Sequence, residues 1–205
     1  MDLLDTILTG GVGVAILGLF GQVLMWYLNN KNSLTVGKSV IKSVDVENLP
    51  DVQSVINRVI DETGIQRVLI MKTENGGGKP RLGAHLYTSI MYEAFKSPLY
   101  STKNDYQRML VDDIYVKMLS DIGPTTHNNL SVVKMKDGLL KRVYLRDGVK
   151  YSEVYYITET DDAFIYMTFS TTDENERFDD PNDRVEIDIS VSKIRNLFGP
   201  HKHTA

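Results

Sequence analysis

The chain contains 205 residues, of which 42% are apolar and 24% charged, and it carries a net charge of −4. These values are ordinary for a protein that folds into one domain with some additional sequence, and the negative charge argues against a nucleic-acid-binding surface. The sequence contains no cysteine, which agrees with a reducing compartment.

Residues 7–28 form an uncharged stretch, ILTGGVGVAILGLFGQVLMWYL. As a helix it would be about 33 Å long, enough to cross a hydrocarbon core of about 30 Å. Trp26 and Tyr27 fall where interfacial aromatic residues anchor a membrane helix. A cleaved signal peptide fits less well because the chain begins MDLLD without a basic region, and a buried core helix seldom stays uncharged for so long. The sequence therefore predicts a transmembrane anchor over residues 1–28, with the lipid bilayer as a partner.

The charges that flank this stretch predict its orientation. Asp2 and Asp5 precede it, whereas Lys31, Lys38 and Lys42 follow it. Because Lys and Arg are retained on the cytoplasmic side, we expect a single-pass protein of the inner membrane. Its N-terminus would lie outside and its C-terminal domain in the cytoplasm.

A row of small and polar residues marks one face of the predicted span. Gly11, Ala15, Gly18 and Gln22 are spaced by four, three and four positions, which places them on the same side of a helix. Small residues let helices pack closely in lipid, and a lone Gln favours a hydrogen bond across the contact. We therefore expect a homo-oligomer that assembles through this face, although glycine is also common in membrane helices that do not associate.

A folded domain is predicted over residues 48–198, between a juxtamembrane linker at 29–47 and a flexible tail at 199–205. Its first element is a helix that starts at Asn48, a candidate cap, and ends at Gly64, with apolar residues at helical spacing. The apolar run at 66–73 predicts a strand, and 81–95 is long enough for a strand with a bend.

The loop ENGGGKP at 74–80 lies between these two predicted strands. A phosphate-binding P-loop requires Ser or Thr after its lysine, whereas Lys79 is followed by Pro80. The asparagine and the three glycines can instead adopt positive φ, so we predict a flexible turn. As a candidate contact site for an anion, an acidic partner or a neighbouring copy, this loop offers Asn75, Gly76, Gly77, Gly78, Lys79 and Arg81.

The second half of the domain is predicted to alternate helices and strands. A helix is expected over 103–122, with Thr102 and Asp105 as a capping pair and Gly123-Pro124 at its end. Strands are expected at 131–136, 149–158 and 162–171, and helices at 138–145 and 184–198, the last one after an acidic loop. This order predicts an α+β fold in which helices flank one antiparallel sheet.

Several of these segments resemble the GAF-type domain, a sensor fold related to PAS domains. The resemblance rests on VINRVIDETGIQRVLIMK, on the glycine turn and on the late strands GVKYSEVYYI and AFIYMTFST. The stretch NGGGKPRLGAHLYTSIMYEAF is also similar to GAF-like proteins of unassigned function from bacteriophages and bacteria. The cyclic-nucleotide motif Asn-Lys-x-Phe-Asp-Glu is not present, and without cysteine a thioether-linked bilin is excluded, so no cofactor is expected. No output module follows the last predicted helix, so we expect any signalling to act through a partner.

Other candidate chemistry is sparse. The four histidines, His85, His127, His201 and His203, form no closed metal site, and the acidic loop at 173–183 lacks the glycine and glutamate positions of an EF-hand. No hydrolase or zinc-protease motif occurs, so we expect no enzymatic activity. Ten tyrosines between positions 87 and 166 either supply an aromatic face for a ligand or subunit, or reflect the preference of tyrosine for strands.

Three functions are compatible with these predictions. The first is a membrane-anchored GAF-like interaction or scaffold protein that self-associates at the inner membrane, with a phage as its candidate origin. The second is a holin-like protein whose glycine-faced spans assemble and permeabilise the membrane. The third is a membrane-tethered sensor of a small molecule.

Overall fold

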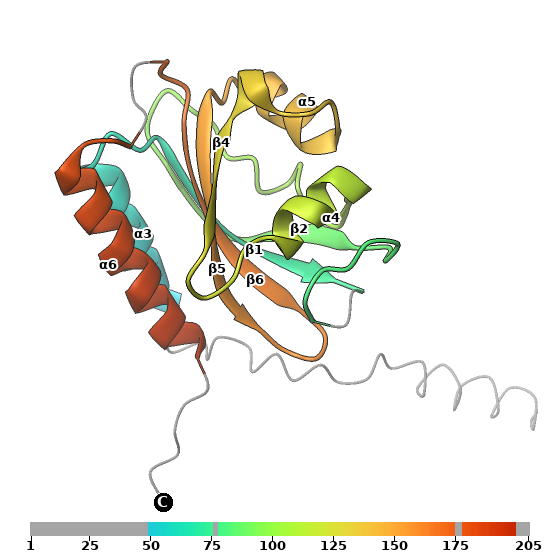
Figure 1. Ribbon diagram of the computed structural model, residues 1–205. Helices are drawn as coiled ribbons and strands as arrows, with labels where there is room; N and C mark the ends of the chain where they lie inside the picture. Colours follow the sequence, from blue (N-terminus) through green and yellow to red (C-terminus); the bar gives the residue numbers. More distant parts are fainter. Residues whose placement is uncertain (1–48, 76–77, 175–177, 200–205) are drawn as a thin grey trace, which may run out of the picture. The chain divides into compact units, whose positions relative to one another are not determined.

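The computed structural model describes residues 49–75, 78–174 and 178–199 (Figure 1). The predicted membrane span, with its small-residue face and its aromatic anchors, lies outside these residues, as do the linker at 29–47, Gly76 and Gly77. None of the helices within the described part of the chain is long and apolar enough to span a bilayer. The membrane anchor, its orientation and its self-association stay predictions.

The domain is built on a six-stranded antiparallel sheet with the strand order β3-β2-β1-β6-β5-β4. Its strands are β1 (Arg67–Glu74), β2 (Tyr87–Phe95), β3 (Met109–Leu110), β4 (His127–Ser131), β5 (Tyr151–Glu159) and β6 (Phe164–Thr171). The two central strands pair over their length, with Arg67 opposite Ser170 and Thr73 opposite Phe164. Every residue of β6 is buried, as expected for a strand covered on both faces.

Helices cover both faces of the sheet (Figure 1). On one face, α3 (Leu49–Glu62) and α6 (Pro181–Phe198) lie side by side. On the other face lie α4 (Asp113–Ser120) and α5 (Leu139–Arg146), the latter after a 3-10 turn, η2 (Val132–Lys134). Val52, Ile56 and Val59 of α3 have no exposed surface, because their helical spacing turns all three toward the sheet.

Most of the predicted elements are confirmed. The first and last helices, the strand before the glycine loop, the helix at 138–145 and the hairpin of β5 and β6 all form where the sequence predicts them, within a few residues. The strand predicted over 81–95 forms only from Tyr87. The α+β fold, an antiparallel sheet with flanking helices, is therefore confirmed.

The helix predicted over 103–122 is wrong in its first half. Residues 103–108 form turns, the next two residues pair with β2 as β3, and only α4 remains of the helix. Thr102 does not cap a helix, because its N–H and its hydroxyl both donate to the Glu93 carboxylate at 2.9 Å. The cap is Asp112, whose side chain accepts from the N–H of Tyr115 at 2.9 Å.

The strand predicted over 131–136 is displaced toward the N-terminus. Residues 132–134 form η2, whereas the strand is β4, with the polar sequence HNNLS. It pairs with β5 from His127 opposite Tyr155 to Ser131 opposite Tyr151. An edge strand needs no regular apolar alternation, so its sequence carries little strand signal.

The glycine loop joins β1 to β2, which are antiparallel neighbours, so the predicted turn between strands is confirmed. Asn75 and Gly78 adopt positive φ angles of 67° and 81°. Gly78 is buried, and a Cβ atom placed on it would lie 2.9 Å from the carbonyl oxygen of Thr160 in the β5–β6 turn. Lys79 and Arg81 are exposed, and their contact with an anion or a partner stays a prediction.

Candidate functional site

A buried arginine occupies the face of the sheet that α4 and α5 cover. Arg67 is the first residue of β1, and its side chain is 7% exposed. Its Nη2 donates to the carbonyl oxygen of Tyr100 at 2.7 Å. Nε lies 3.7 Å from Glu93 Oε1 and Nη1 lies 3.8 Å from Asp147 Oδ2, so both carboxylates are near but neither is hydrogen-bonded. Among the described residues, no atom accepts a hydrogen bond from the buried Nε.

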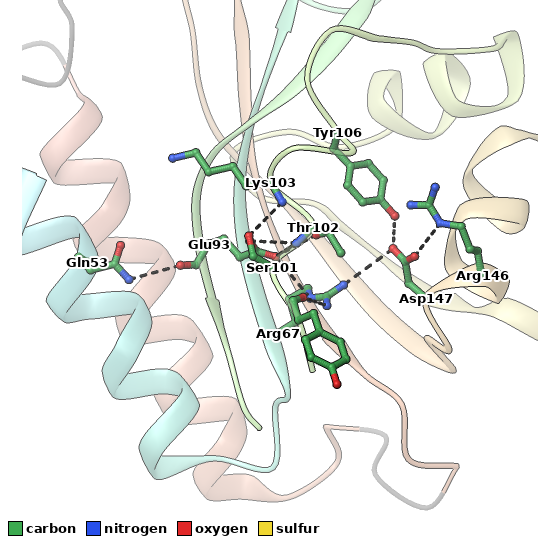
Figure 2. Close-up of polar contacts among 10 residues, drawn as sticks. Gln53, Arg67, Glu93, Ser101, Thr102, Lys103, Tyr106, Arg146 and Asp147 are labelled. Carbon is green, nitrogen blue, oxygen red and sulfur yellow. Dashed lines mark hydrogen bonds and ion pairs between the residues drawn. The ribbon is translucent and has the colours of Figure 1, made fainter. Parts of the chain in front are cut away.

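Glu93 of β2 fixes the loop that crosses the end of the sheet (Figure 2). Its carboxylate is 4% exposed and accepts from the Ser101 hydroxyl at 2.5 Å and from the N–H and hydroxyl of Thr102 at 2.9 Å. These bonds stabilise the turn in which the N–H of Tyr106 donates to the Thr102 carbonyl at 3.2 Å. Residues 99–106 are thus held over the sheet by the same carboxylate that faces Arg67.

Asp147, just after α5, is the second acid of the site (Figure 2). It accepts a short hydrogen bond from the Tyr106 hydroxyl and another from Arg146 Nε at 2.9 Å. The Arg146 guanidinium also lies 5.4 Å from the centre of the Tyr106 ring. Burial, and then the hydrogen bond to Asp147, raise the pKa of Tyr106 well above its usual value, so this phenol remains a proton donor.

A cavity of about 20 Å³ borders these residues, which is room for about one water molecule. It is lined by Arg67, Tyr106 and Asp147 and by further residues of β1, β6, α4 and α5. Two guanidinium groups, of Arg67 and Arg146, balance the two carboxylates. The site therefore combines a buried donor without an acceptor, a small space beside it, and no net charge.

Buried phenols fill the remaining space between the sheet and the two short helices. The hydroxyls of Tyr115 and Tyr166 lie 2.8 Å apart, and that of Tyr166 lies 2.7 Å from Thr88 Oγ1. Tyr144 as a whole is half-buried, but its hydroxyl donates to Ser152 Oγ at 3.0 Å and its desolvation raises the pKa to about 12. Of the two interpretations of the tyrosines, an open aromatic face is excluded for these three residues, since their hydroxyls bond to one another or to side chains of the sheet inside the domain.

The site is connected to the opposite face of the sheet through Glu93. Its carbonyl oxygen accepts from Gln53 Nε2 of α3 at 3.4 Å, while its carboxylate lies beside Arg67 (Figure 2). One residue of β2 therefore contacts the arginine of the site with its side chain and the first helix of the domain with its backbone.

The residues of this site are not those that the sequence suggested. Asn75, Gly78, Lys79 and Arg81 lie in the loop beyond the other end of β1 and contribute nothing to it. A signal was nevertheless present, because Arg67 and Glu93 are charged residues inside apolar strand sequences, QRVLIM and SIMYEAF. A charge within such a run either lies at an edge or is buried with a partner.

No family model matches the chain, and a search of curated proteins finds no match. Among solved structures, a far-red cyanobacteriochrome photoreceptor is similar at 11% identity and a TM-score of 0.53, over 91% of this chain and 100% of that one. The cyanobacteriochrome receptor PixJ is similar at 11% identity and a TM-score of 0.51, over 74% of this chain and 97% of that one. The PixJ GAF domain of Thermosynechococcus elongatus in its blue-light absorbing form gives 10% identity and a TM-score of 0.47, over 76% and 91%. Likeness at such identities shows the fold alone, and the fold of this domain is GAF-like.

Proposed function

We propose that this chain is a membrane-tethered, non-enzymatic sensor whose GAF-like domain binds a small polar molecule at Arg67. The observation that carries the proposal is the Nε–H of Arg67, a buried donor without an acceptor on a residue that also lines a small cavity. An unmade hydrogen bond of a buried charged group costs free energy, about 1–3 kcal/mol or more, which a ligand with an oxygen acceptor would recover. The similarity of the fold to a photoreceptor adds support to a sensory role.

The loop of residues 99–106 is the element that would admit the ligand. It is held by side-chain bonds to Glu93 and by the bond from Arg67 to the Tyr100 carbonyl, while the Tyr100 side chain is 83% exposed. The cavity takes only about one water molecule as it stands, so a molecule of several heavy atoms needs this loop to move outward. A ligand that bonds Arg67 would thereby compete with the contacts that close the loop.

Ligand binding at Arg67 would be transmitted to the rest of the chain through a change in the contacts of α3. A ligand that draws Arg67 away from Glu93 changes the contacts of a residue whose backbone accepts from Gln53 of α3. In the sequence, α3 directly follows the linker at 29–47 and the predicted membrane span. The tether and the self-association through Gly11, Ala15, Gly18 and Gln22 belong to the proposal and rest on sequence patterns alone. No described residue favours the holin-like alternative over this one.

A thermal-shift screen of the full chain with small carboxylates, amino acids and phosphates tests the proposal. A compound present at 100 times its Kd stabilises the folded state by about 2.7 kcal/mol, which corresponds to roughly 5–11 °C for a chain of this size. The shift should disappear in Arg67→Lys, which keeps the charge but has no Nε–H. It should persist in the matched control Arg142→Lys, an exposed arginine of α5. A screen without hits, or hits that Arg67→Lys leaves unchanged, contradicts the proposal.

A further inference from the structure

The segment from η2 through α5 is strongly basic within an acidic chain. Residues 130–150 contain six Lys or Arg and two Asp, whereas the whole chain has a net charge of −4. Lys141 is paired with Asp137 at 2.9 Å. Lys134, Lys136 and Arg142 are exposed, and no carboxylate of the described residues lies within ion-pair distance of them. Three cations on this part of the surface are therefore available to an external partner.

Exposed apolar side chains are interspersed with these cations. Val133 is 84% exposed and Leu145 is 60% exposed, although neighbouring Val132, Leu140 and Val143 are buried in the domain. On α5, positions 142 and 145 are three residues apart and so share the outward side of the helix. Of the exposed cations, Lys136 also lines an apolar groove of about 160 Å³, together with Ile114, Met118, Met135 and Lys141. We call Val133, Lys134, Lys136, Arg142 and Leu145 the α5 surface.

The opposite charge is concentrated in the acidic loop before α6 and in α6 itself. Residues 173–188 contain eight Asp or Glu against two Arg, and those from Pro181 onward form the first turns of α6. α6 lies on the other face of the sheet from α5 (Figure 1). Part of the acidic segment nevertheless lies near the basic one, because Glu174 pairs with Lys150 at 2.9 Å and Asp179 lines the same pocket as Lys134. The acids of α6 lie on the face away from α5, so a negatively charged surface favours contact through α5 over contact through α6.

We propose that the α5 surface docks on an anionic lipid bilayer. Lipid headgroups supply a dense negative charge for Lys134, Lys136 and Arg142, and the boundary of the acyl chains accepts isolated apolar side chains such as Val133 and Leu145 without a matching pocket. An acidic protein partner would instead need a surface shaped to match these separate apolar side chains. Each basic residue near such a surface shifts the docking equilibrium about fivefold, so the three unpaired cations together contribute on the order of 100-fold.

Labelling single cysteines in the full chain tests this contact, because the natural sequence has none. Leu145→Cys carries an environment-sensitive fluorophore, and Val185→Cys on α6 is the matched control, since the two native side chains are 60% and 59% exposed. The chain is combined with phosphatidylcholine vesicles with and without phosphatidylglycerol. The probe reports its own position relative to lipid, so the reading holds whether or not residues 1–28 insert.

We expect a blue shift and quenching by a lipid-borne quencher for the label at 145, only in the anionic vesicles, and no change for the label at 185. Salt at about 1 M should reverse the effect, because the Debye length falls to about 3 Å. Adding Lys134→Gln, Lys136→Gln and Arg142→Gln should lower the docked population on the order of 100-fold. Equal signals at both positions, or equal signals with and without the anionic lipid, overturn the proposal. A shift that depends on protein concentration in the absence of lipid also overturns it, since the surface would then contact a second copy.

Discussion

Arg67 and Glu93 place opposite charges in the interior of the domain, with side chains that are 7% and 4% exposed. Burying a charge costs several kcal/mol unless polar partners replace the lost water. Glu93 obtains them from Ser101 and Thr102, and Arg67 obtains one from the Tyr100 carbonyl. The pair therefore orders a loop as well as balancing charge, while no described residue accepts a hydrogen bond from the Arg67 Nε–H.

Removing this arginine should destabilise the domain strongly. Arg67→Met leaves Glu93 and Asp147 without their buried cation, so we expect the free energy of unfolding to fall by about 3–5 kcal/mol. Urea unfolding of the full chain measures the change. The control is Arg142→Met, an exposed arginine, where a change within about 0.5 kcal/mol is expected. Similar losses in the two variants would mean that Arg67 is not a buried, charge-balancing residue.

At the scale of elements, the sequence pattern predicted those helices and strands whose formation depends on residues close together in the sequence. The apolar stripe of α3 and the dense apolar runs of β1, β5 and β6 made these elements predictable. The pair Thr102 and Asp105 looked like a helix start, but Glu93, nine residues earlier on another element, takes the Thr102 donors. The site was missed for the same reason, because sequence spacing does not show that Arg67, Glu93 and Asp147 converge.

Two glycine substitutions between β1 and β2 distinguish the energetic cost of backbone strain from that of a steric contact. Gly78 and Gly83 both have positive φ, 81° and 82°. A Cβ on Gly78 would meet the Thr160 carbonyl oxygen at 2.9 Å, whereas a Cβ on Gly83 would meet nothing within 4 Å. Gly83→Ala should therefore cost about 1–2 kcal/mol from the backbone alone, and Gly78→Ala about 2–4 kcal/mol because the contact is added.

Urea midpoints of the two glycine variants measure this difference. If Gly78→Ala is no more destabilising than Gly83→Ala, the loop does not pack against the β5–β6 turn. The larger loss would instead indicate that the glycine loop is partly buried against its own chain, with only Lys79 and Arg81 free to meet a partner.

At the scale of the whole molecule, the sheet separates two kinds of interior. The face under α3 and α6 is mainly aliphatic, whereas the face under α4 and α5 holds Arg67 and most of the buried phenols. The composition did not predict how the two faces differ, since the ten tyrosines between positions 87 and 166 were compatible with an exposed aromatic face as well as with a core. Their enclosure has a thermodynamic consequence, because a phenol buried in apolar surroundings is more costly to ionise.

Alkaline pH should therefore unfold the domain. Burial raises the pKa of Tyr144 to about 12 and raises the pKa values of Tyr106, Tyr115 and Tyr166 as well, whereas an unfolded tyrosine ionises near pH 10. Below about pH 10 both states keep these protons, so their contribution to stability is complete. Above it the unfolded state loses protons that the folded state retains, and stability falls by about 1.4 kcal/mol per pH unit for each such phenol.

The melting temperature followed from pH 9 upward, together with tyrosinate absorbance, tests this linkage. We expect the melting temperature to drop steeply above about pH 10, with the absorbance of the buried phenols rising in a single step as the domain unfolds. Tyr144→Phe should make the decline shallower by about 1.4 kcal/mol per pH unit, because one of the shifted phenols is gone. A gradual rise in absorbance with an unchanged melting temperature would instead mean that these hydroxyls reach water in the folded domain, and that α4 and α5 do not close over the sheet.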